Sequence, residues 1–231
     1  MFRSFFTRIF QLFFPENCVV CNDALRYSER VLCSSCLLDI PRVYFHNSER
    51  NPLEDLLWGH IPYVRASSLF YYYKEQTYAS LIYDLKYKNR PDIGVFLGEL
   101  FAAELDSARF FDGIDYIVPI PLHKKRLRTR KYNQSEKIAE GLSVYSNIPI
   151  ASSLIQRTIH TKTQTQKNKE ERMRNVSNIF KVTRPQDIHD KHILLVDDII
   201  TTGATTISCT QSLLEADSSV RVSIVSLGLA R

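Results

Sequence analysis

The stretch from Ile193 to Thr206, ILLVDDIITTGATT, constrains the fold of this 231-residue chain more than any other. Four apolar residues, 193–196, run without alternation, which is typical of a short strand buried on both faces of a parallel sheet. The two carboxylates of Asp197 and Asp198 are expected to end that strand. A run of threonines around Gly203 follows, and then a segment with helical spacing. This order predicts a phosphate cradle at the carboxyl end of a strand.

The acidic pair narrows the ligand that such a cradle could take. Carboxylates repel phosphate, so Asp197 and Asp198 must face sugar hydroxyls or a bound Mg²⁺. A ligand with a sugar diol at one end and a 5′-phosphate at the other satisfies both halves of the stretch. The alternative is an ordinary strand end and helix cap. It is disfavoured because two adjacent carboxylates ending a buried strand are costly without a partner.

The stretch resembles the 5-phosphoribosyl-1-pyrophosphate (PRPP) site of type I phosphoribosyltransferases, in which an apolar strand precedes Asp-Asp, two apolar residues and Thr-Thr-Gly-x-Thr. The resemblance covers every position from Ile193 to Thr205. It leaves the catalytic residues undefined. The PRPP-binding residues that it implies, together with Mg²⁺, are Asp197, Asp198, Thr201, Thr202, Gly203, Ala204 and Thr205.

The N-terminal region holds Cys18-Val-Val-Cys21 and, eleven residues later, Cys33-Ser-Ser-Cys36. Two such pairs are typical of a tetrahedral Cys₄ zinc site, and four thiolates leave no open position, so a structural Zn²⁺ is predicted. Disulfides are the alternative, but they need an oxidising compartment. The fifth cysteine, Cys209, is expected to be a small buried residue.

The first residues predict a short amphipathic helix over residues 2–13, ended by Pro15. We expect it to pack on the protein, with a partner or a membrane surface as the alternative. Arg8 and Gln11 interrupt the apolar run and no small-residue cleavage site follows, which disfavours a signal peptide. No stretch reaches the roughly 18 apolar residues of a membrane span. A cytoplasmic protein is therefore expected.

The net charge of +5 is unevenly distributed. Between Ile120 and Lys181 there are 14 Lys and Arg against 4 Glu and no Asp, so the remainder carries a net −5. Six of these cations fall within residues 124–131, directly after a strand predicted at 116–120. At that edge of the sheet they would suit a pyrophosphate or a nucleic-acid backbone. A solvated charged face is the alternative.

The remaining pattern predicts an α/β fold with a mostly parallel sheet flanked by helices. The resemblance of residues 193–205 implies that this sheet is type I phosphoribosyltransferase-like, and the cysteine pairs predict a small N-terminal zinc-ribbon-like module. The expected domains are 1–58, the N-terminal helix and Cys₄ module, and 63–231. Within the second, residues 157–180 lack core periodicity and predict a mobile loop. Other expected strands are 64–73, with Tyr71 to Tyr73 on a sheet edge, and 222–227; expected helices are 77–88, 95–105 and 132–145.

These segments together resemble the ComF family, phosphoribosyltransferase-like proteins of bacterial competence and DNA uptake, over nearly the whole chain. Leu85-Lys86-Tyr87 matches the family's hood region. Lys131 and Asn178 stand where glycines are usual, and Lys167 where a leucine is. A further family pattern is matched by Pro119, Pro121, Leu122 and His123, and then by Arg130, Lys131, Tyr132, Asn133 and Gln134.

The resemblance implies two further groups of site residues. The pyrophosphate or basic loop would comprise His123, Lys124, Lys125, Arg126, Arg130, Asn133 and Gln134. The mobile loop would contribute Arg157, Gln164, Arg172 and Asn175.

Three functions fit this sequence. The first is a PRPP-binding ComF-type protein that acts in uptake or handling of single-stranded DNA, with a competence helicase as a possible partner. The second is a phosphoribosyltransferase for an unidentified acceptor, in which Mg²⁺ and the cations neutralise the departing pyrophosphate. The third is a PRPP-sensing regulator.

Overall fold

The computed structural model describes residues 16–48, 50–158 and 179–231, so the helix predicted over 2–13 lies outside the described residues. Its central feature is a sheet with strand order β1-β6-β5-β2, in which every pairing is parallel. The strands are β1 (Ala66–Tyr72), β2 (Tyr116–Pro119), β5 (His192–Ile200) and β6 (Arg221–Ala230). A separate antiparallel pair consists of β3 (Ile155–Arg157) and β4 (Phe180–Val182).

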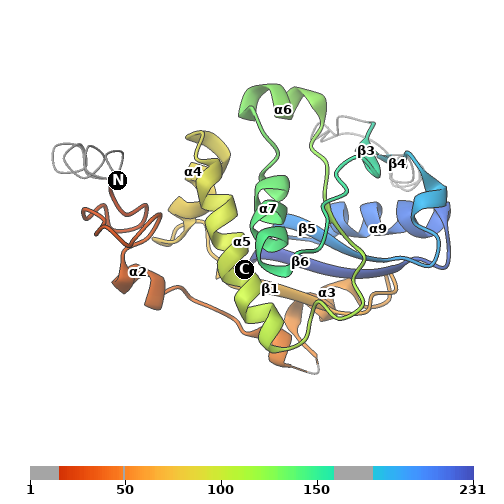
Figure 1. Cartoon of the computed structure of the whole chain (residues 1–231), viewed down its shortest axis with the longest axis horizontal. Coiled ribbons are helices and arrows are strands. Elements are labelled where there is room, and N and C mark those ends of the chain that lie inside the picture. The colour runs from red at the N-terminus through yellow and green to blue at the C-terminus, as the bar shows by residue number, and fades with distance from the viewer. Residues whose placement is uncertain (1–15, 49, 159–178) are drawn as a thin grey trace.

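Helices connect these strands and cover the sheet (Figure 1). The predicted fold class, a parallel α/β sheet flanked by helices with a small cysteine-bearing N-terminal module, is confirmed. Among the described residues, no helix is both long and apolar enough for a membrane crossing. The helical segments are α2 (Ser34–Leu38), η1 (Phe45–Asn47), α3 (Pro52–Leu57), α4 (Ala79–Tyr87), α5 (Pro91–Ser107), α6 (Lys124–Arg130), α7 (Gln134–Ser146), η2 (Pro185–Asp187) and α9 (Ala204–Ala216).

Side chains of β5 alternate between two buried clusters. Leu194 and Val196 pack with apolar residues of α4, α5 and α7, whereas Ile193 and Leu195 pack with those of α9. Figure 1 shows α5 and α7 in front of the sheet. Burial on both faces explains why this strand is apolar without alternation, as its sequence indicated.

Strand β5 is longer than its sequence predicts. Asp197 and Asp198 do not end it: the register with β6 continues through Asp197 opposite Ser226 to Ile200 opposite Leu229. The expectation that the acidic pair ends the strand is therefore wrong. The backbone pairing continues because the peptide groups of a strand join the ladder whatever the polarity of its side chains.

The outer edge of β1 is covered by the chain that follows the cysteine module. Arg42 bridges to Phe70, and the Val43 N–H donates to the Leu69 carbonyl at 3.1 Å. Within the module, Val31 and Leu32 are buried in the same cluster as α4 and α5. The segment between module and sheet is also structured, because α3 buries its leucines in the cluster on the α9 face. The proposed division into 1–58 and 63–231 stays a prediction.

Helices α5 and α7 approach each other closely through two glycines. A Cβ added at Gly141 would lie 2.1 Å from the Val95 carbonyl oxygen, and one at Gly98 would lie 2.3 Å from the Ile138 carbonyl oxygen. Both obstacles are backbone atoms and cannot rotate away. The position of α7, which begins beside the end of β5, therefore depends on these glycines.

We expect Gly141→Ala to destabilise the fold by about 1–3 kcal/mol, the usual cost of overpacking, although alanine favours a helix. Urea unfolding followed by circular dichroism measures the effect. Ala103→Val, at an exposed position of α5, is the control and should cost less than about 1 kcal/mol. A Gly141→Ala protein as stable as the wild type would contradict the close helix contact.

Candidate functional site

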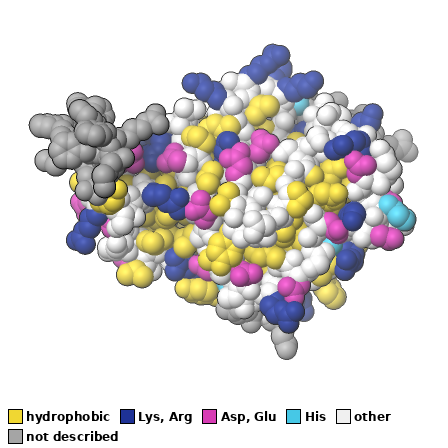
Figure 2. Space-filling model, viewed as in Figure 1, with side chains coloured by type: hydrophobic (Ala, Val, Ile, Leu, Met, Phe, Trp, Pro, Cys, Tyr) yellow, Lys and Arg dark blue, Asp and Glu magenta, His cyan; other side chains and the backbone are white. Residues whose placement is uncertain are grey.

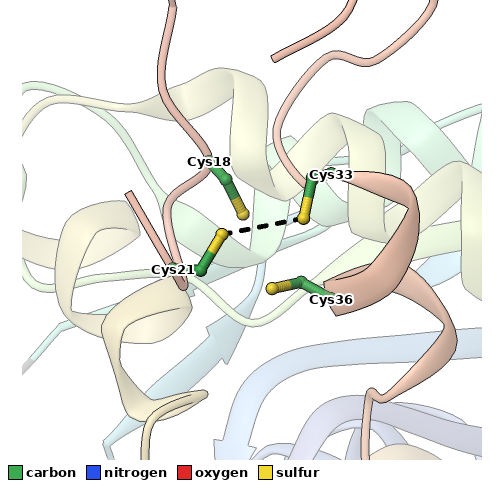
Figure 3. A group of neighbouring side chains, drawn as sticks. All are labelled: Cys18, Cys21, Cys33 and Cys36. Atoms are coloured by element: carbon green, nitrogen blue, oxygen red, sulfur yellow. Dashed lines mark hydrogen bonds between the residues drawn. The ribbon is translucent and has the colours of Figure 1, made fainter. Parts of the chain in front are cut away.

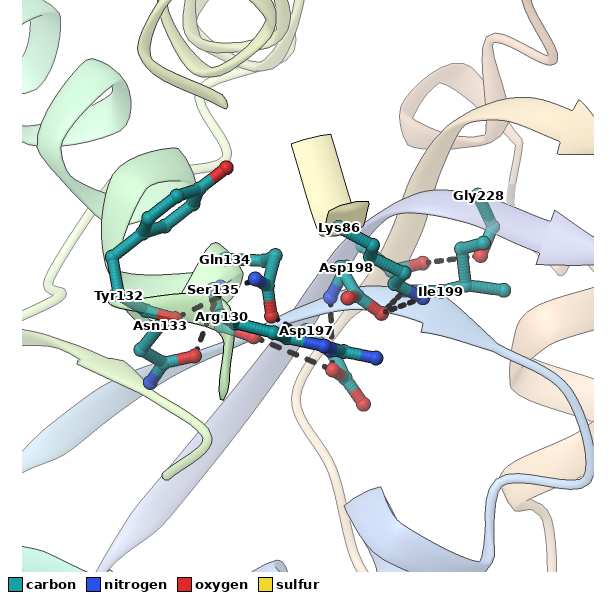
Figure 4. A network of polar contacts seen from close by, with 11 residues as sticks. Lys86, Arg130, Tyr132, Asn133, Gln134, Ser135, Asp197, Asp198, Ile199 and Gly228 are labelled. Atoms are coloured by element: carbon teal, nitrogen blue, oxygen red, sulfur yellow. Dashed lines mark hydrogen bonds and ion pairs between the residues drawn. The ribbon is translucent and has the colours of Figure 1, made fainter. Parts of the chain in front are cut away.

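The acidic pair lies at the end of β5 where α4, α7 and α9 converge. Neighbouring residues of a strand point to opposite faces, so Asp198 shares the α4 face with Val196 and Asp197 the other. Asp197 Oδ1 accepts from the Asp198 N–H at 2.8 Å, and Asp198 Oδ1 accepts from the Ile199 N–H at 2.6 Å. Ser135 Oγ donates to Asp197 Oδ1 at 3.4 Å. These contacts hold both carboxylates in fixed positions (Figure 4).

Lys86 neutralises Asp198. Its Nζ lies 3.0 Å from Asp198 Oδ1, and the two side chains are only 17% and 13% exposed. A largely buried pair of this kind balances a cost of desolvation against a strong attraction. Sequence analysis named Lys86 only as part of the Leu85-Lys86-Tyr87 resemblance and gave it no role. No local pattern could have placed it here, since α4 precedes β5 by most of the domain.

Asp197 has an unusual protonation equilibrium. Burial, and after it the negative charge of Asp198, raise its pKa to about 7. The Asp198 N–H, the Lys86 ammonium and the Ser135 hydroxyl act in the opposite direction and only partly compensate. Near neutral pH this carboxyl is thus divided between its protonated and ionised forms. A cation or a ligand hydroxyl that approaches it would shift that balance.

The loop after β5 leads directly into α9. Thr201 and Thr202 are exposed, while Gly203 is buried and has a φ of +71°. A side chain at Gly203 would be strained and would also meet Leu56 of α3 at 3.4 Å. The first turn of α9 begins at Ala204 and includes Thr205. All seven residues predicted for PRPP binding therefore lie at one end of the sheet, and their binding role stays a prediction.

The basic segment after β2 is a helix rather than a loop. His123 caps α6, since its Nδ1 accepts from the Lys125 N–H at 3.2 Å. None of the residues of α6 is buried, so Lys124, Lys125 and Arg126 present their charges to solvent. The helix ends at Arg130, and Lys131, which follows it, has a left-handed φ of +69°. This explains in physical terms why glycine suits that position in the family pattern.

Asn133 and Gln134 fix the start of α7. Asn133 Nδ2 donates to the Ile120 carbonyl at 3.0 Å, and its Oδ1 accepts from the Ser135 N–H at 3.2 Å. Gln134 is fully buried, and its Oε1 accepts from Arg130 at 2.8 Å. These two residues, predicted as part of a pyrophosphate loop, thus connect α6 and α7 to the end of β2.

The end of α4 contacts three separate parts of the site. The Leu85 carbonyl accepts from the Tyr132 hydroxyl, and the guanidinium of Arg130 lies 5.4 Å from the centre of the Tyr87 ring. Lys86, between them, reaches Asp198. A groove of about 700 Å³ separates α4 from α6. Its lining residues are Lys86, Tyr87, Asn89, Lys125, Arg126, Thr129, Arg130 and Lys131.

Only one of the four predicted mobile-loop residues can be placed. Arg157 is half-buried at the end of β3, with its guanidinium 5.5 Å from the Phe180 ring centre. Burial and the nearby charge of Arg126 lower the pKa of Arg157, while Asp197 acts in the opposite direction. This places Arg157 within electrostatic reach of the acidic pair. Gln164, Arg172 and Asn175 lie outside the described residues.

Four cysteine sulfurs form a second, separate cluster (Figure 3). The Sγ atoms of Cys18, Cys21, Cys33 and Cys36 all lie within 4.8 Å of one another, so the group could hold a metal ion. Burial opposes ionisation of Cys18, yet hydrogen bonds from the backbone of Cys21 and Cys33 lower its pKa to about 7. Burial raises the pKa of Cys36. A site with one readily ionised thiol suits a thiophilic cation.

Comparison with known proteins identifies the family. DNA utilization protein YhgH of Escherichia coli strain K12 is 31% identical over 200 residues, which cover 85% of this chain and 83% of the relative. The chain belongs to the ComF family. Competence protein F of Haemophilus influenzae is 26% identical over 84% of the chain and 88% of its own length. Competence protein ComFC of Bacillus subtilis is 33% identical over 48% of the chain and 43% of its own length.

Solved structures similar to this ComF-family chain have low TM-scores. A glutamine PRPP amidotransferase from B. subtilis, complexed with ADP and GMP, has a TM-score of 0.42 and 21% identity, covering 61% of this chain and 30% of its own. Adenine phosphoribosyltransferase from Leishmania tarentolae has a TM-score of 0.37 and 13% identity, covering 80% and 89%. No family model matches the chain.

We expect Asp197→Asn to stabilise this ComF-family protein at high pH. Since the folded pKa of about 7 exceeds the ordinary value of about 4, the folded state binds the proton more tightly. The free energy of unfolding that protonated Asp197 contributes to the wild type is therefore lost as the pH rises from about 4 through 7. The variant should gain at least about 1.4 kcal/mol above pH 7, the value of one pKa unit, and little near pH 4.

Urea unfolding of both proteins between pH 4.5 and 8 measures this difference. Asp106→Asn, at an exposed position of α5, is the control and should show no such trend. A stability gain for Asp197→Asn that does not grow with pH would refute the assigned protonation.

Proposed function

We propose that this ComF-family chain binds PRPP, or a related phosphoribosyl ligand, with Mg²⁺ at the end of β5. The observation that carries the proposal is the position of Asp197 and Asp198 near the end of β5, beside the loop 201–203 and the start of α9. Carboxylates close to such a loop can meet ribose hydroxyls and a cation, while the loop amides meet the phosphate.

Cations on the other side of the site complete the proposed binding surface. Lys86 and Arg130 line the groove between α4 and α6, and Lys125 and Arg126 extend it along α6. Arg157 approaches from β3. A pyrophosphate carries several negative charges close together, and convergent Lys and Arg side chains from separate elements can neutralise them. Asn133 and Gln134 support this arrangement by holding α6 against α7.

We assign the protein a role in uptake or handling of single-stranded DNA, with a competence helicase as a candidate partner. The relatives are called DNA utilization and competence proteins, and the exposed cations of α6 support the same role. A strand of nucleic acid would release counterions on binding to them. PRPP would then act as a regulatory ligand, because Lys86 belongs to both the groove and the acidic pair.

A second candidate function is transfer of phosphoribose to an acceptor. The pKa of Asp197, about 7, favours it, because a general base works best when its pKa lies near the operating pH. Release of pyrophosphate from PRPP in the presence of a nucleobase panel would distinguish this function from binding alone.

The double variant Asp197→Asn with Asp198→Asn should bind PRPP at least tenfold more weakly than the wild type in the presence of Mg²⁺, a loss of about 1.4 kcal/mol or more. The reason is that the amides cannot hold the cation that joins the carboxylates to the ligand. Isothermal titration calorimetry, with and without Mg²⁺, measures both effects. Asp106→Asn is the control. Equal affinity in the double variant would place the sugar elsewhere.

We also propose that the four clustered cysteines hold a structural Zn²⁺. Cys18 and Cys21 flank a turn, Cys33 and Cys36 lie at the start of α2, and the four sulfurs lie close enough for tetrahedral coordination. A folded module this small gains most of its stability from its metal. Elsewhere in the described residues, Cys209 is buried among apolar side chains of the α9 face and is remote from this group.

Protein purified without chelator should contain about one equivalent of zinc by mass spectrometry of the metal. Cys33→Ser should lose most of it because three thiolates bind zinc more weakly than four. Cys209→Ala is the matched control and should keep its zinc. Wild-type protein without zinc, or a Cys33→Ser protein with full zinc, would end the proposal.

A further inference from the structure

Two exposed tyrosines form a pair on the outer side of α4. Tyr83 and Tyr87 are four residues apart, and their ring centres lie 5.1 Å from each other at an interplanar angle of 48°. They are 55% and 64% exposed. The buried residues of α4, including Leu81 and Leu85, lie on the opposite side of the helix and already anchor it. The pair is therefore not needed to hold α4 on the sheet.

Cations flank this tyrosine pair at both ends. Lys88 Nζ lies 6.0 Å from the Tyr83 ring centre, and the Arg130 guanidinium lies 5.4 Å from that of Tyr87. Arg130 is the last residue of α6, so the row of rings continues directly into the basic helix. Figure 2 shows Lys and Arg side chains gathered at the top of the molecule, over α6. Rings and cations thus form one continuous surface.

A second groove runs along the other side of the tyrosine pair, toward the acidic pair. Its volume is about 860 Å³, and it extends from Lys74 and Gln76 past Tyr83 to Ile199 and Thr201 at the end of β5. Lys86 lines both this groove and the one beside α6. The linings of the two grooves hold seven cations and two acidic residues, and two of the cations are paired, Lys86 with Asp198 and Lys88 with Asp84. The cations are Lys74, Lys86, Lys88, Lys125, Arg126, Arg130 and Lys131, and the acids are Glu75 and Asp84.

We propose that Tyr83 and Tyr87 stack the bases of a single-stranded nucleic acid whose phosphates follow the cations of α6. Aromatic rings beside a cationic track are the two parts of a sequence-independent single-strand site. A free nucleobase would need a pocket that encloses it, whereas more than half of each tyrosine stays accessible. A duplex hides its bases and could use only the cations. The inference rests on the DNA-handling part of the proposed function and is independent of its PRPP part.

The test compares fluorescent 20-nucleotide oligodeoxythymidine with an abasic oligomer of the same length and charge, at low salt. Wild-type protein should bind the base-bearing strand at least about fivefold more tightly than the abasic strand or a duplex. Tyr83→Ala and Tyr87→Ala should each weaken binding of the base-bearing strand at least about fivefold, the value of one stacked base, and leave the abasic strand unaffected. Tyr83→Phe should retain the affinity.

Tyr145→Ala, which removes an exposed tyrosine near the far end of α7, is the matched control and should bind as the wild type does. Circular dichroism checks that each variant is folded. The proposal is overturned if wild type binds abasic and base-bearing strands equally, or if the tyrosine variants keep full affinity. It is also overturned if sedimentation shows a wild-type dimer that Tyr83→Ala and Tyr87→Ala dissociate, because a second copy of the chain would then cover the pair.

PRPP titrations of Tyr83→Ala separate this proposal from the function on which it rests. If Tyr83→Ala keeps its PRPP affinity and loses single-strand binding, the result supports both the stacking site and the DNA-handling role. Unchanged PRPP affinity with unchanged single-strand binding overturns the stacking site alone. Absence of any single-strand binding by the wild type overturns the DNA-handling role and the stacking site together.

Discussion

Two carboxylates held side by side near the end of a buried strand are the constraint on which the candidate site depends. Asp197 and Asp198 repel each other, and their burial weakens the solvation of negative charge. Ionisation of one carboxyl therefore opposes ionisation of the other. The protein resolves this in two ways. Lys86 neutralises Asp198, and the pKa of Asp197 is raised to about 7, so that Asp197 stays largely protonated below neutral pH. Removing one partner of a largely buried ion pair typically costs about 3–5 kcal/mol. The site is thus poised to accept a cation.

The neutralising lysine lies in the part of α4 that contacts the rest of the site. Leu85 and Tyr87, on either side of Lys86, contact Tyr132 and Arg130. The last turn of α4 therefore connects the acidic pair to the basic helix and to the tyrosine pair. A ligand that draws Lys86 away from Asp198 would disturb contacts on both sides. That shared residue gives a physical route by which occupancy of one groove could change affinity in the other.

The sequence predicts the fold and the two motifs because their information is local. An unbroken apolar run identifies β5, and the threonines and glycine that follow it identify the start of α9. The spacing of the two cysteine pairs predicts that their four sulfurs cluster. The hydrophobic pattern did not predict that β5 continues past Asp198, because side-chain polarity does not report backbone pairing. It also did not predict the helix at Lys124–Arg130, because this segment has no apolar periodicity although Lys and Arg favour helices.

Long-range partners could not be predicted in this way. Nothing near Asp198 indicates that Lys86 of α4 will neutralise it, and nothing near Asn133 indicates that its amide will bind the end of β2. Such contacts follow from how the crossovers pack, which depends on details such as the glycine contact between α5 and α7. The resemblance to a known family named candidate segments, and their binding roles stay predictions; only the packing shows which residues position others.

A ligand and cation bound as proposed would displace the proton of Asp197. Calorimetric titration with Mg²⁺ and PRPP at pH 7, in buffers of different ionisation enthalpy, counts the protons released on binding. With a pKa of about 7, the wild type should release about half a proton more per ligand than Asp197→Asn. Equal proton release by the two proteins would contradict the account.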